Sequence, residues 1–258
     1  MPNSDSFVSK NNLWNILRST KYSNIVPKTY LLDNYYDLEN FKKDHHKDKL
    51  YILKKNIQNK KGLKLIQGNY NTIINTYNLE NYKLVQEFIF NTILDKQFVI
   101  RIYILAIKRL NQNKVNVYYN KYNKLLFAEK NLAQNNFKSK MLITNSKHNI
   151  PENPKNLAEL KNTNKIDNNI MDILLGIKYI ITKQCENENK LFNFSQFQLF
   201  GIDIICDANL NCYLLEINKN PNMSNFHSEK EKIEKREIIK DMYTLVMNSE
   251  KINSFISL

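Results

Sequence analysis

Glycine is scarce in this chain of 258 residues, which contains 4 glycines, 5 prolines and 1 tryptophan. Long apolar runs are missing too, because no stretch approaches the roughly 18 uninterrupted apolar residues of a membrane helix. The first residues also lack a basic region followed by an apolar segment, which is the pattern of a secretory signal. We therefore expect neither a membrane span nor a secretory signal, and we expect each glycine to mark a special backbone position.

Cysteine is rare as well, and Cys185, Cys206 and Cys212 form neither a CxxC motif nor an even set. An odd count without paired spacing predicts reduced thiols rather than the disulfide framework of a secreted protein. Cys206 and Cys212 lie in apolar runs, where cysteine commonly serves as a small buried side chain. Pairing or metal binding by these two residues is the alternative that the spacing leaves open.

Positive charge is abundant, but little of it is arginine. The 38 basic residues exceed the 25 acidic ones and give a net charge of +13 at pH 7, yet only Arg18, Arg101, Arg109 and Arg236 are arginines. A basic chain suits an acidic partner, such as nucleic acid, an anionic membrane face, nucleotide phosphates or an acidic peptide. Because lysine is spread over every segment and no nucleic-acid-binding motif is present, we expect mostly solvated lysines and no specific nucleic acid.

The rest of the composition is that of a folded protein, with 42% hydrophobic and 11% aromatic residues. The length fits one large domain or two small ones. Short apolar runs predict strands, and longer apolar stripes predict helices. Strands are expected at 50–53, 62–66, 83–89, 98–110, 114–120, 197–207 and 211–218, helices at 70–81, 169–185 and 229–247, and a long surface connection at 131–168. This mixture, without strict βαβ alternation, predicts an α+β fold with a largely antiparallel sheet.

The sharpest polar cluster lies on the last predicted hairpin. Asp203 is in its first strand, and Glu216 and Asn218 are in its second. Residues two apart share one face of a strand, and hairpin pairing brings Asp203 opposite that face, so three oxygen donors converge. Two carboxylates and a carboxamide suit Mg²⁺, which binds through carboxylates together with substrate phosphates. Solvent-facing residues of an amphipathic hairpin are the alternative, but apolar neighbours such as Ile202 and Leu214 embed these charges.

Residues 197–223, FQLFGIDIICDANLNCYLLEINKNPNM, resemble the terminal signature of the tubulin tyrosine ligase and ligase-like family, a member of the ATP-grasp superfamily. The family pattern runs FxLFGxDxxxD and then WLxEVNxxP, so the spacing from Asp to Glu, the ExN pair and the later Pro agree. Shorter matches follow in the family's order. They are VPKTYLL at 26–32, KGLKLI at 61–66, VQEFI at 85–89, QFVIRIYILA at 97–106 and LITN at 142–145.

The resemblance implies an ATP-grasp fold, in which two α+β lobes with mainly antiparallel sheets enclose a nucleotide. On this interpretation, residues 1–45 are a short N-terminal segment, 46–90 are the central lobe, and 91–258 are the C-terminal lobe with the metal-binding hairpin. The N-terminal segment is shorter than the family's usual first region. Part of the acceptor-binding surface is therefore expected to be missing or supplied by another protein.

The resemblance also implies a set of site residues. The hinge at 86–89 would hold adenine, the loop at 56–62 would close over the phosphates, and either Lys54 or Lys55 would bind phosphate. Arg101 resembles the family's clamp on the acyl phosphate, with a salt-bridged strand arginine as the alternative. The expected residues are Arg101 and Glu216 for catalysis; Lys54, Lys55, Lys61, Gly62, Gln86, Glu87, Phe88, Ile89, Thr144, Asn145 and Asp203 for ATP; and Asp203, Glu216 and Asn218 for the metal.

The function that the resemblance implies is that of an ATP- and Mg²⁺-dependent carboxylate–amine ligase. Such an enzyme would join tyrosine, glutamate or glycine to a carboxylate of an acidic protein tail, for example that of tubulin, through an acyl phosphate. ATP and Mg²⁺ are the expected cofactors. A free amino acid and an acidic protein or peptide are the expected partners, with no specific nucleic acid and no membrane, in the cytoplasm.

Four positions depart from the family's pattern. Val99 occupies the place of the Asp in DLR, Lys64 replaces the second Gly of the loop, Leu142 replaces the His of HLTN, and Lys219–Asn220 replace the small pair after ExN. These changes predict either altered acceptor specificity or weakened catalysis with retained nucleotide binding. A catalytically impaired relative that binds nucleotide or an acidic partner is therefore the alternative function.

Overall fold

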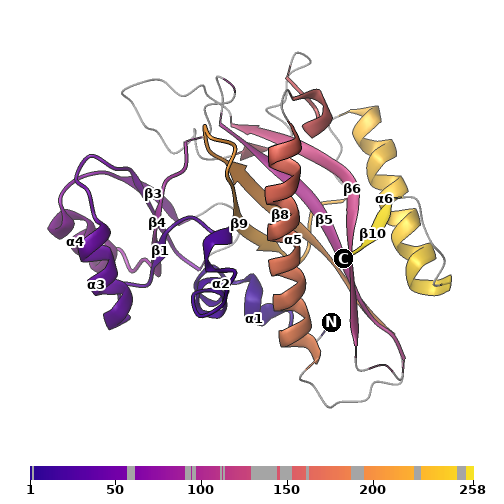
Figure 1. Cartoon of the computed structure of the whole chain (residues 1–258), viewed down its shortest axis with the longest axis horizontal. Coiled ribbons are helices and arrows are strands. Elements are labelled where there is room, and N and C mark those ends of the chain that lie inside the picture. Colours follow the sequence, from indigo (N-terminus) through magenta and orange to yellow (C-terminus); the bar gives the residue numbers. More distant parts are fainter. Residues whose placement is uncertain are drawn as a thin grey trace.

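The computed structural model describes residues 1, 3–56, 62–90, 94, 97–110, 112, 114–128, 144–145, 153–160, 163–186, 195–223, 228–248 and 254–258. They form two lobes, each built on an antiparallel sheet (Figure 1). The expected α+β class with two antiparallel sheets is therefore confirmed. No helix in this described part has the length and apolar character needed to cross a membrane.

The smaller sheet has four strands in the order β1-β4-β2-β3. One face packs on the two helices of this lobe, where Leu53 and Val85 contact a core that includes Phe41 and Ile73. The other face carries Lys54 and lines a cleft toward the larger lobe. The elements are β1 (Thr29–Tyr30), α3 (Tyr35–Asp44), β2 (Tyr51–Lys54), β3 (Leu63–Ile66), α4 (Tyr70–Leu79) and β4 (Leu84–Glu87).

The larger sheet runs in the order β10-β6-β5-β8-β9, and β7 pairs with β6. Alternate residues of β5 face opposite sides: Ile102 and Ile104 pack in the core beneath α5, whereas Leu105 and Ile107 pack with α6. The sheet is therefore covered by a helix on each face, as Figure 1 shows. The elements are β5 (Phe98–Lys108), β6 (Val115–Ala128), β7 (Thr144–Asn145), η4 (Leu157–Glu159), α5 (Thr163–Glu186), β8 (Gln196–Cys206), β9 (Cys212–Asn218), α6 (Glu229–Asn248) and β10 (Phe255–Ser257).

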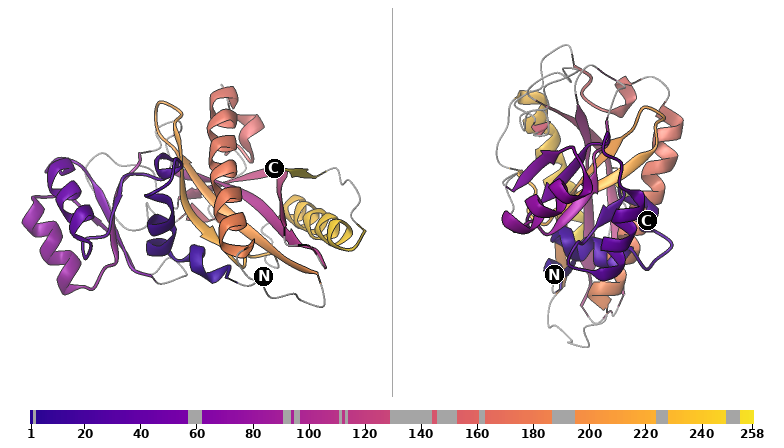
Figure 2. Two further views of the ribbon diagram at one scale, coloured as in Figure 1. Left: turned by 60° about the horizontal axis from the view of Figure 1, so that its bottom comes forward. Right: turned by 90° about the vertical axis from the view of Figure 1, so that its left-hand side faces the viewer.

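The N-terminal segment contributes to both lobes. The helices α1 (Asp5–Val8) and α2 (Lys10–Leu17), with the turn η1 (Ser23–Ile25), pack against the α5 side of the larger sheet. By contrast, β1 and α3 belong to the smaller sheet and its core. Figure 2 places α1 and α2 between the small lobe and α5. The segment boundaries at 45 and 90 stay a prediction.

Most expected elements appear within a few residues of their predicted limits, but α3 was not predicted. Asn34 begins this helix by accepting hydrogen bonds from the amides of Tyr36 and Asp37. Only Asp37 and Phe41 of the helix are buried, so its sequence lacks the apolar periodicity from which a helix is predicted. Strand β6 is longer than predicted, because its polar continuation after residue 120 still pairs with β5.

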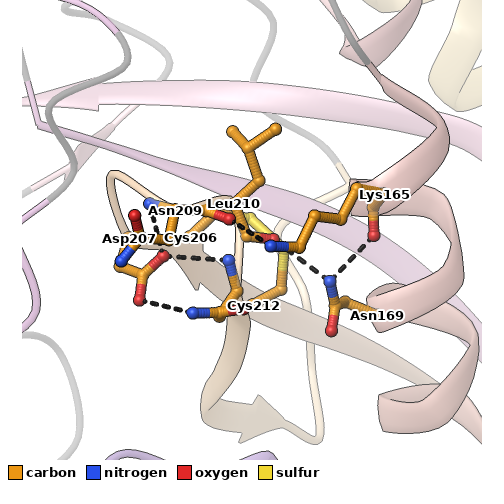
Figure 3. Close-up of a disulfide and its surroundings, with 8 residues drawn as sticks. Lys165, Asn169, Cys206, Asp207, Asn209, Leu210 and Cys212 are labelled. Carbon is orange, nitrogen blue, oxygen red and sulfur yellow. Dashed lines mark hydrogen bonds between the residues drawn. A yellow bond between two sulfur atoms is a disulfide. The ribbon is translucent and has the colours of Figure 1, made fainter.

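The prediction of reduced thiols is wrong for two of the three cysteines. Cys206 and Cys212 form a disulfide across the β8–β9 hairpin, near its turn (Figure 3). They face each other directly in the strand register, and both are buried. The pairing follows from a turn length that places the two sulfur atoms opposite one another, which was the alternative that the spacing left open. Cys185 lies outside this disulfide and is buried in α5.

Candidate functional site

A cleft between the two lobes has one wall from each. The small lobe contributes the cleft face of β2, β3 and β4 together with the hinge that follows, and the larger lobe contributes side chains of β5, β8 and β9. The expected hinge, one of the two candidate lysines and both carboxylates therefore meet in one place. The lining residues are Lys10, Ile52, Lys54, Leu63, Gln86, Glu87, Phe88, Ile89, Gln97, Val99, Asp203, Ile205, Leu215 and Glu216.

Strand pairing aligns Arg101, Asp203 and Glu216 in one row. Arg101 of β5 pairs with Asp203 of β8, which pairs with Glu216 of β9. The β8–β9 register then shifts between Asp203 and Ile204, so that Leu215 is an extra residue of β9. Both Leu215 and Glu216 line the cleft, as expected for a bulge that re-aims side chains. The sequence predicted that Asp203 and Glu216 meet, but neither the pairing of Asp203 with Arg101 nor the bulge.

The polar side chains of this row contact one another. Arg101 donates hydrogen bonds to both carboxylate oxygens of Asp203, with 2.8 Å between Nη2 and Oδ2. Asn218 Nδ2 lies 3.1 Å from Glu216 Oε1 and 3.5 Å from Asp203 Oδ2. The three expected metal-binding residues therefore lie together. Arg101 is therefore a salt-bridged strand arginine, which was the alternative interpretation of this residue. It would have to release Asp203 before its guanidinium could bind a phosphate through two N–H groups.

Two neighbouring carboxylates in a desolvated site disfavour each other's ionisation. Burial, reinforced by the charge of Glu216, raises the pKa of Asp203 although Arg101 opposes the shift. Burial also acts to raise the pKa of Glu216, but the hydrogen bond from Asn218 and the charges of nearby basic residues, Lys10 first among them, outweigh it and lower that pKa. Glu216 is therefore the carboxylate that ionises more readily.

Strand geometry separates the two candidate phosphate-binding lysines. Lys54 faces the cleft, is only 6% exposed and donates a hydrogen bond from Nζ to Gln86 Oε1 at 2.6 Å. Burial lowers the pKa of Lys54 to about 8. The Lys55 Nζ instead lies 4.9 Å from the centre of the Tyr82 ring, and Lys55 does not line the cleft as described. Of the two alternatives, the geometry favours Lys54.

The hinge residues all line the cleft, but several of their polar groups already have partners. The backbone N–H groups of Glu87 and Phe88 donate to carbonyl oxygens of the small lobe at 2.8 and 3.0 Å. The carbonyl oxygen of Ile89 accepts a hydrogen bond from Gln97 Nε2 at 2.8 Å. Adenine binding by this hinge stays a prediction, and it would have to use the other backbone groups or displace these contacts.

The remaining expected nucleotide contacts are only partly covered by the described residues. Gly62 has a φ of 75°, and a Cβ atom there would lie 2.8 Å from Lys55 Cβ, so the position requires glycine. Lys61 lies outside the described residues. Thr144 and Asn145 form β7 and pair with the end of β6. The roles of all four residues in ATP binding stay predictions.

Two of the departures from the family's pattern lie in different lobes, and only one of them faces the cleft. Val99 lines the cleft within an apolar cluster that contains Leu126 and Ile205. Lys64 lies on the outer face of β3, where its Nζ forms an ion pair with Glu80. Val99 therefore removes a polar group from the cleft itself, whereas Lys64 points away from it.

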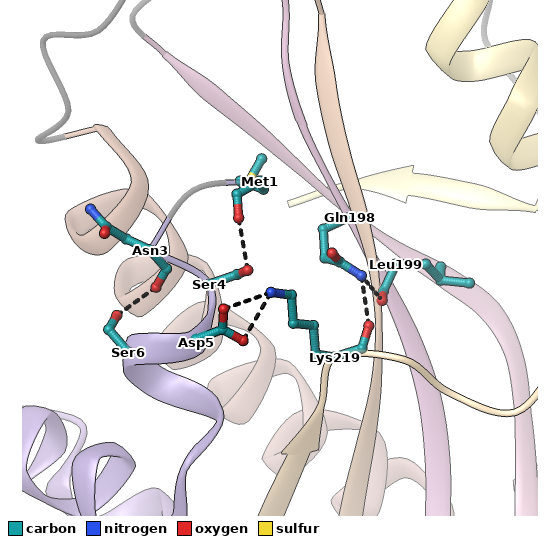
Figure 4. Close-up of polar contacts among 8 residues, drawn as sticks. All are labelled: Met1, Asn3, Ser4, Asp5, Ser6, Gln198, Leu199 and Lys219. Atoms are coloured by element: carbon teal, nitrogen blue, oxygen red, sulfur yellow. Dashed lines mark hydrogen bonds and ion pairs between the residues drawn. The ribbon is translucent and has the colours of Figure 1, made fainter.

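Lys219, a third departure, connects the N-terminal helix α1 with the end of the β8–β9 hairpin. Its Nζ lies 2.9 Å from both carboxylate oxygens of Asp5 in α1 (Figure 4). Its carbonyl oxygen accepts a hydrogen bond from Gln198 Nε2 at 2.6 Å. Lys219 therefore has a structural partner in this chain. Leu142 lies outside the described residues.

Lys10 and Gln97 are cleft residues that the sequence reasoning missed. Burial lowers the pKa of Lys10, and the charge of Glu216 opposes that shift, so the two side chains interact across the site. Lys10 begins α2, which packs against the larger lobe. Nothing in the sequence connected this helix with strands near the other end of the chain.

The residues present fit a hard divalent cation. No group of three or more His, Cys, Asp or Glu side chains suited to a metal occurs among the described residues. The expected set instead combines two carboxylates with the carboxamide of Asn218. Burial is the main cause of the raised pKa of Asp203, and a cation would relieve the repulsion from Glu216 that adds to it. Because Arg101 holds both oxygens of Asp203, Glu216 is the better placed first ligand.

Gly201 keeps space for Arg101 beside this site. A Cβ atom at residue 201 would lie 3.0 Å from Pro221 Cβ and 3.2 Å from Arg101 Nη1. We expect Gly201→Ala to lower the free energy of unfolding by about 1–3 kcal/mol, since overpacking forces a neighbour to move. Urea denaturation measures the loss, and Gly201→Ala should cost less in a Pro221→Gly background, which lacks the contacting Cβ atom. Unchanged stability of Gly201→Ala would contradict the expectation.

Comparison with known proteins agrees with the motifs. No curated protein matches the chain at a significant level. A model described as the tubulin-tyrosine ligase family matches residues 1–253, nearly the whole chain. That match includes the N-terminal helices, which the motifs at 26–223 do not cover. The chain belongs to the tubulin-tyrosine ligase family.

Proposed function

We propose that the chain is an ATP- and Mg²⁺-dependent ligase that joins tyrosine, glutamate or glycine to a carboxylate of an acidic protein tail, such as that of tubulin, through an acyl phosphate. Membership of the family supports a ligase-type enzyme that acts on protein tails. The observation that carries the finer proposal is the meeting of Lys54, Asp203 and Glu216 in one cleft between the lobes.

The two walls of the cleft have complementary chemistry. Lys54 of the small lobe and Lys10 of α2 supply positive charge that would attract phosphate oxygens, and both charges act on Glu216. Ile205 and Leu215 offer apolar surface against which a purine could pack. Mg²⁺, when bound, would neutralise phosphate charge and stabilise the charge that develops during phosphoryl transfer. The chain itself would contribute positioning and electrostatics, without a covalent protein nucleophile.

The acceptor is proposed to be acidic because the chain is basic. The net charge of +13 would draw an acidic tail toward the protein and speed its encounter at low salt. Arg101 would take part at the acyl phosphate only by exchanging Asp203 for the phosphate, since both carboxylate oxygens are bound to its guanidinium. A planar guanidinium suits such an exchange, because it binds carboxylate and phosphate with the same two-armed geometry.

Incubation with ATP, Mg²⁺ and labelled amino acids tests the proposal directly. Tyrosine, glutamate and glycine would each be offered with tubulin and with an acidic peptide, and mass spectrometry would locate any added residue. We expect ADP release that requires both the amino acid and the acceptor. A peptide in which every glutamate and aspartate is replaced by its amide and the C-terminal carboxylate is amidated is the matched control and should accept nothing. Absence of added mass with every amino acid and acceptor would reject the ligase assignment for these substrates.

A second candidate function is nucleotide or acidic-partner binding without catalysis. Val99 places an apolar side chain where the family pattern has an acidic one, and it lies on the cleft wall. In that case Mg-ATP should raise the melting temperature through ligand binding. The same samples would release no ADP in a coupled assay, whichever amino acid and acceptor were present.

A further inference from the structure

A line of hydrogen bonds crosses the small sheet and ends on Lys54. The Lys54 ammonium donates to Gln86 Oε1 at 2.6 Å, and Gln86 Nε2 donates to Thr29 Oγ1 at 2.7 Å. The Thr29 hydroxyl in turn donates to the carbonyl oxygen of Pro27 at 2.7 Å. Lys54, Gln86 and Thr29 are all buried, and we call these three side chains the Lys54 network.

The order of the strands brings the network together. Gln86 lies on β4, between Thr29 on β1 and Lys54 on β2. Thr29 is directly opposite Gln86 in the strand register. Ile52 pairs with Gln86 on the other side, so Lys54 is the diagonal neighbour of Gln86 on the same face. The network is thus built into the pairing of three strands.

The chemistry of its two ends fixes the direction of the network. An ammonium can only donate hydrogen bonds, so Lys54 requires an oxygen from Gln86. The Thr29 hydroxyl directs its single proton to Pro27, so it can only accept from Gln86. The Gln86 carboxamide therefore satisfies both neighbours in one orientation alone, with Oε1 toward Lys54 and Nε2 toward Thr29.

Lys54 depends on this acceptor because it is both buried and charged. Burial lowers the pKa of Lys54 to about 8, while the charge of Glu216 acts to raise that pKa and the charge of Lys10 acts to lower it. The other carboxylates that line the cleft have cationic partners, Asp203 with Arg101 and Glu87 with Lys49. A hydrogen bond to the charged form favours that form, so the oxygen of Gln86 opposes the effect of burial.

The same contact aims the ammonium. Lys54 and Gln86 both line the cleft. With one N–H group held by Gln86, the ammonium can direct its other two toward phosphate oxygens of a ligand in the cleft. If the carboxamide turned over, its NH₂ group would face the ammonium, and two donors would then oppose each other.

We propose that Thr29 is a positioning residue of the nucleotide site, because its hydroxyl fixes the orientation of the Gln86 carboxamide that holds the Lys54 ammonium toward the cleft. Thr29 itself does not line the cleft as described, and it acts only through Gln86 and Lys54. The effect on nucleotide binding rests on the proposed function, whereas the effect on Lys54 in the free protein does not.

Thr29→Val in the full chain removes the hydroxyl and keeps the shape of the side chain. A buried N–H group without an acceptor is costly, so we expect the Gln86 carboxamide to leave its present orientation and Lys54 to lose its oxygen partner. Calorimetric titration at pH 7 with Mg²⁺ and a non-hydrolysable ATP analogue should show affinity weakened by about 10-fold. The affinity should also begin to fall at a lower pH than in the parent, where the pKa of Lys54 is about 8.

Three further measurements make the test specific to this hydroxyl. Thr29→Ser keeps a hydroxyl and should bind nucleotide within about twofold of the parent. Thr76→Val removes the hydroxyl of a threonine in α4, where it donates to the Thr72 carbonyl oxygen at 2.9 Å, and should leave affinity unchanged. In a Lys54→Met background, Thr29→Val should weaken binding no further, because its effect passes through Lys54.

Nuclear magnetic resonance of the Lys54 side chain follows its protonation without nucleotide. We expect the pKa of Lys54 to be near 8 in the parent, lower in Thr29→Val and restored in Thr29→Ser. If Thr29→Val does not fold, Thr29→Cys should lower the pKa of Lys54 in the same direction, since a thiol is a weak acceptor.

An unchanged pKa of Lys54 in the variants that lack the hydroxyl would overturn the proposal. Equal losses of affinity from Thr29→Val in the parent and in the Lys54→Met background would overturn it too, since Thr29 would then act by some other route. Failure of the parent to bind nucleotide would instead count against the proposed function, and the pKa of Lys54 would still decide the role of Thr29.

Discussion

Glu216→Gln should reduce ADP release by at least about 100-fold while the protein stays folded, because loss of a direct ligand should exceed the roughly 10- to 100-fold loss found for groups that only orient a ligand. Glutamine keeps the shape of the side chain and an oxygen for the Asn218 hydrogen bond, which spans 3.1 Å in the parent. It removes the carboxylate that ionises more readily of the two in the cleft. Because Asp203 would lose its like-charged neighbour, its raised pKa should fall.

A matched control separates this effect from a general loss of acidic charge. Glu80 lies outside the cleft, where its carboxylate pairs with Lys64 on the outer face of β3. Glu80→Gln should therefore leave ADP release within about twofold of the parent, as is usual for surface substitutions. Turnover by Glu216→Gln at the rate of the parent, with the same Mg²⁺ dependence, would show that Glu216 does not hold the metal.

The central polar cluster could be predicted because it depends on local rules. The two-residue period of a strand places Glu216 and Asn218 on one face, and a short turn brings Asp203 opposite them. The structure shows these three side chains in contact. The bulge was not predictable, since Leu214 and Leu215 are identical and either one suits either face. The disulfide depends on the same strand register. Because that register could not be predicted, the pairing of Cys206 with Cys212 stayed an open alternative.

The basic side of the cleft shows why other residues could not be assigned from the sequence. Counting from Gly62 favoured Lys55, whereas the apolar run before it favoured Lys54, and only the pairing of β2 with its neighbours decides which lysine faces the cleft. Lys10 reaches the cleft through the packing of α2 on the larger lobe. Such long-range packing leaves no periodic signal in a single sequence.

The Lys54 ammonium should make both stability and nucleotide binding depend on pH. Its pKa in the folded protein is about 8, below the usual 10.5, because the group is buried. Between these values the unfolded chain holds a proton that the folded protein has released, so the free energy of unfolding should rise with pH across this window. Nucleotide affinity should fall as pH rises through about 8, since neutral Lys54 no longer attracts phosphate. Lys54→Arg should bind nucleotide without that dependence, because arginine keeps its charge.

Lys54→Met should therefore separate stability from nucleotide binding. At pH 7 methionine fills a similar volume and removes a buried charge, which offsets the loss of the hydrogen bond to Gln86. The free energy of unfolding should therefore change little and should lose its rise between pH 8 and 10.5. Affinity for a Mg-ATP analogue should drop by about 10- to 100-fold, the value of a hydrogen bond to a charged group. Lys55→Met is the matched control, because Lys55 packs on Tyr82 away from the cleft, and its affinity should stay within about twofold of the parent. Equal losses in both variants would show that phosphate binding does not depend on which lysine faces the cleft.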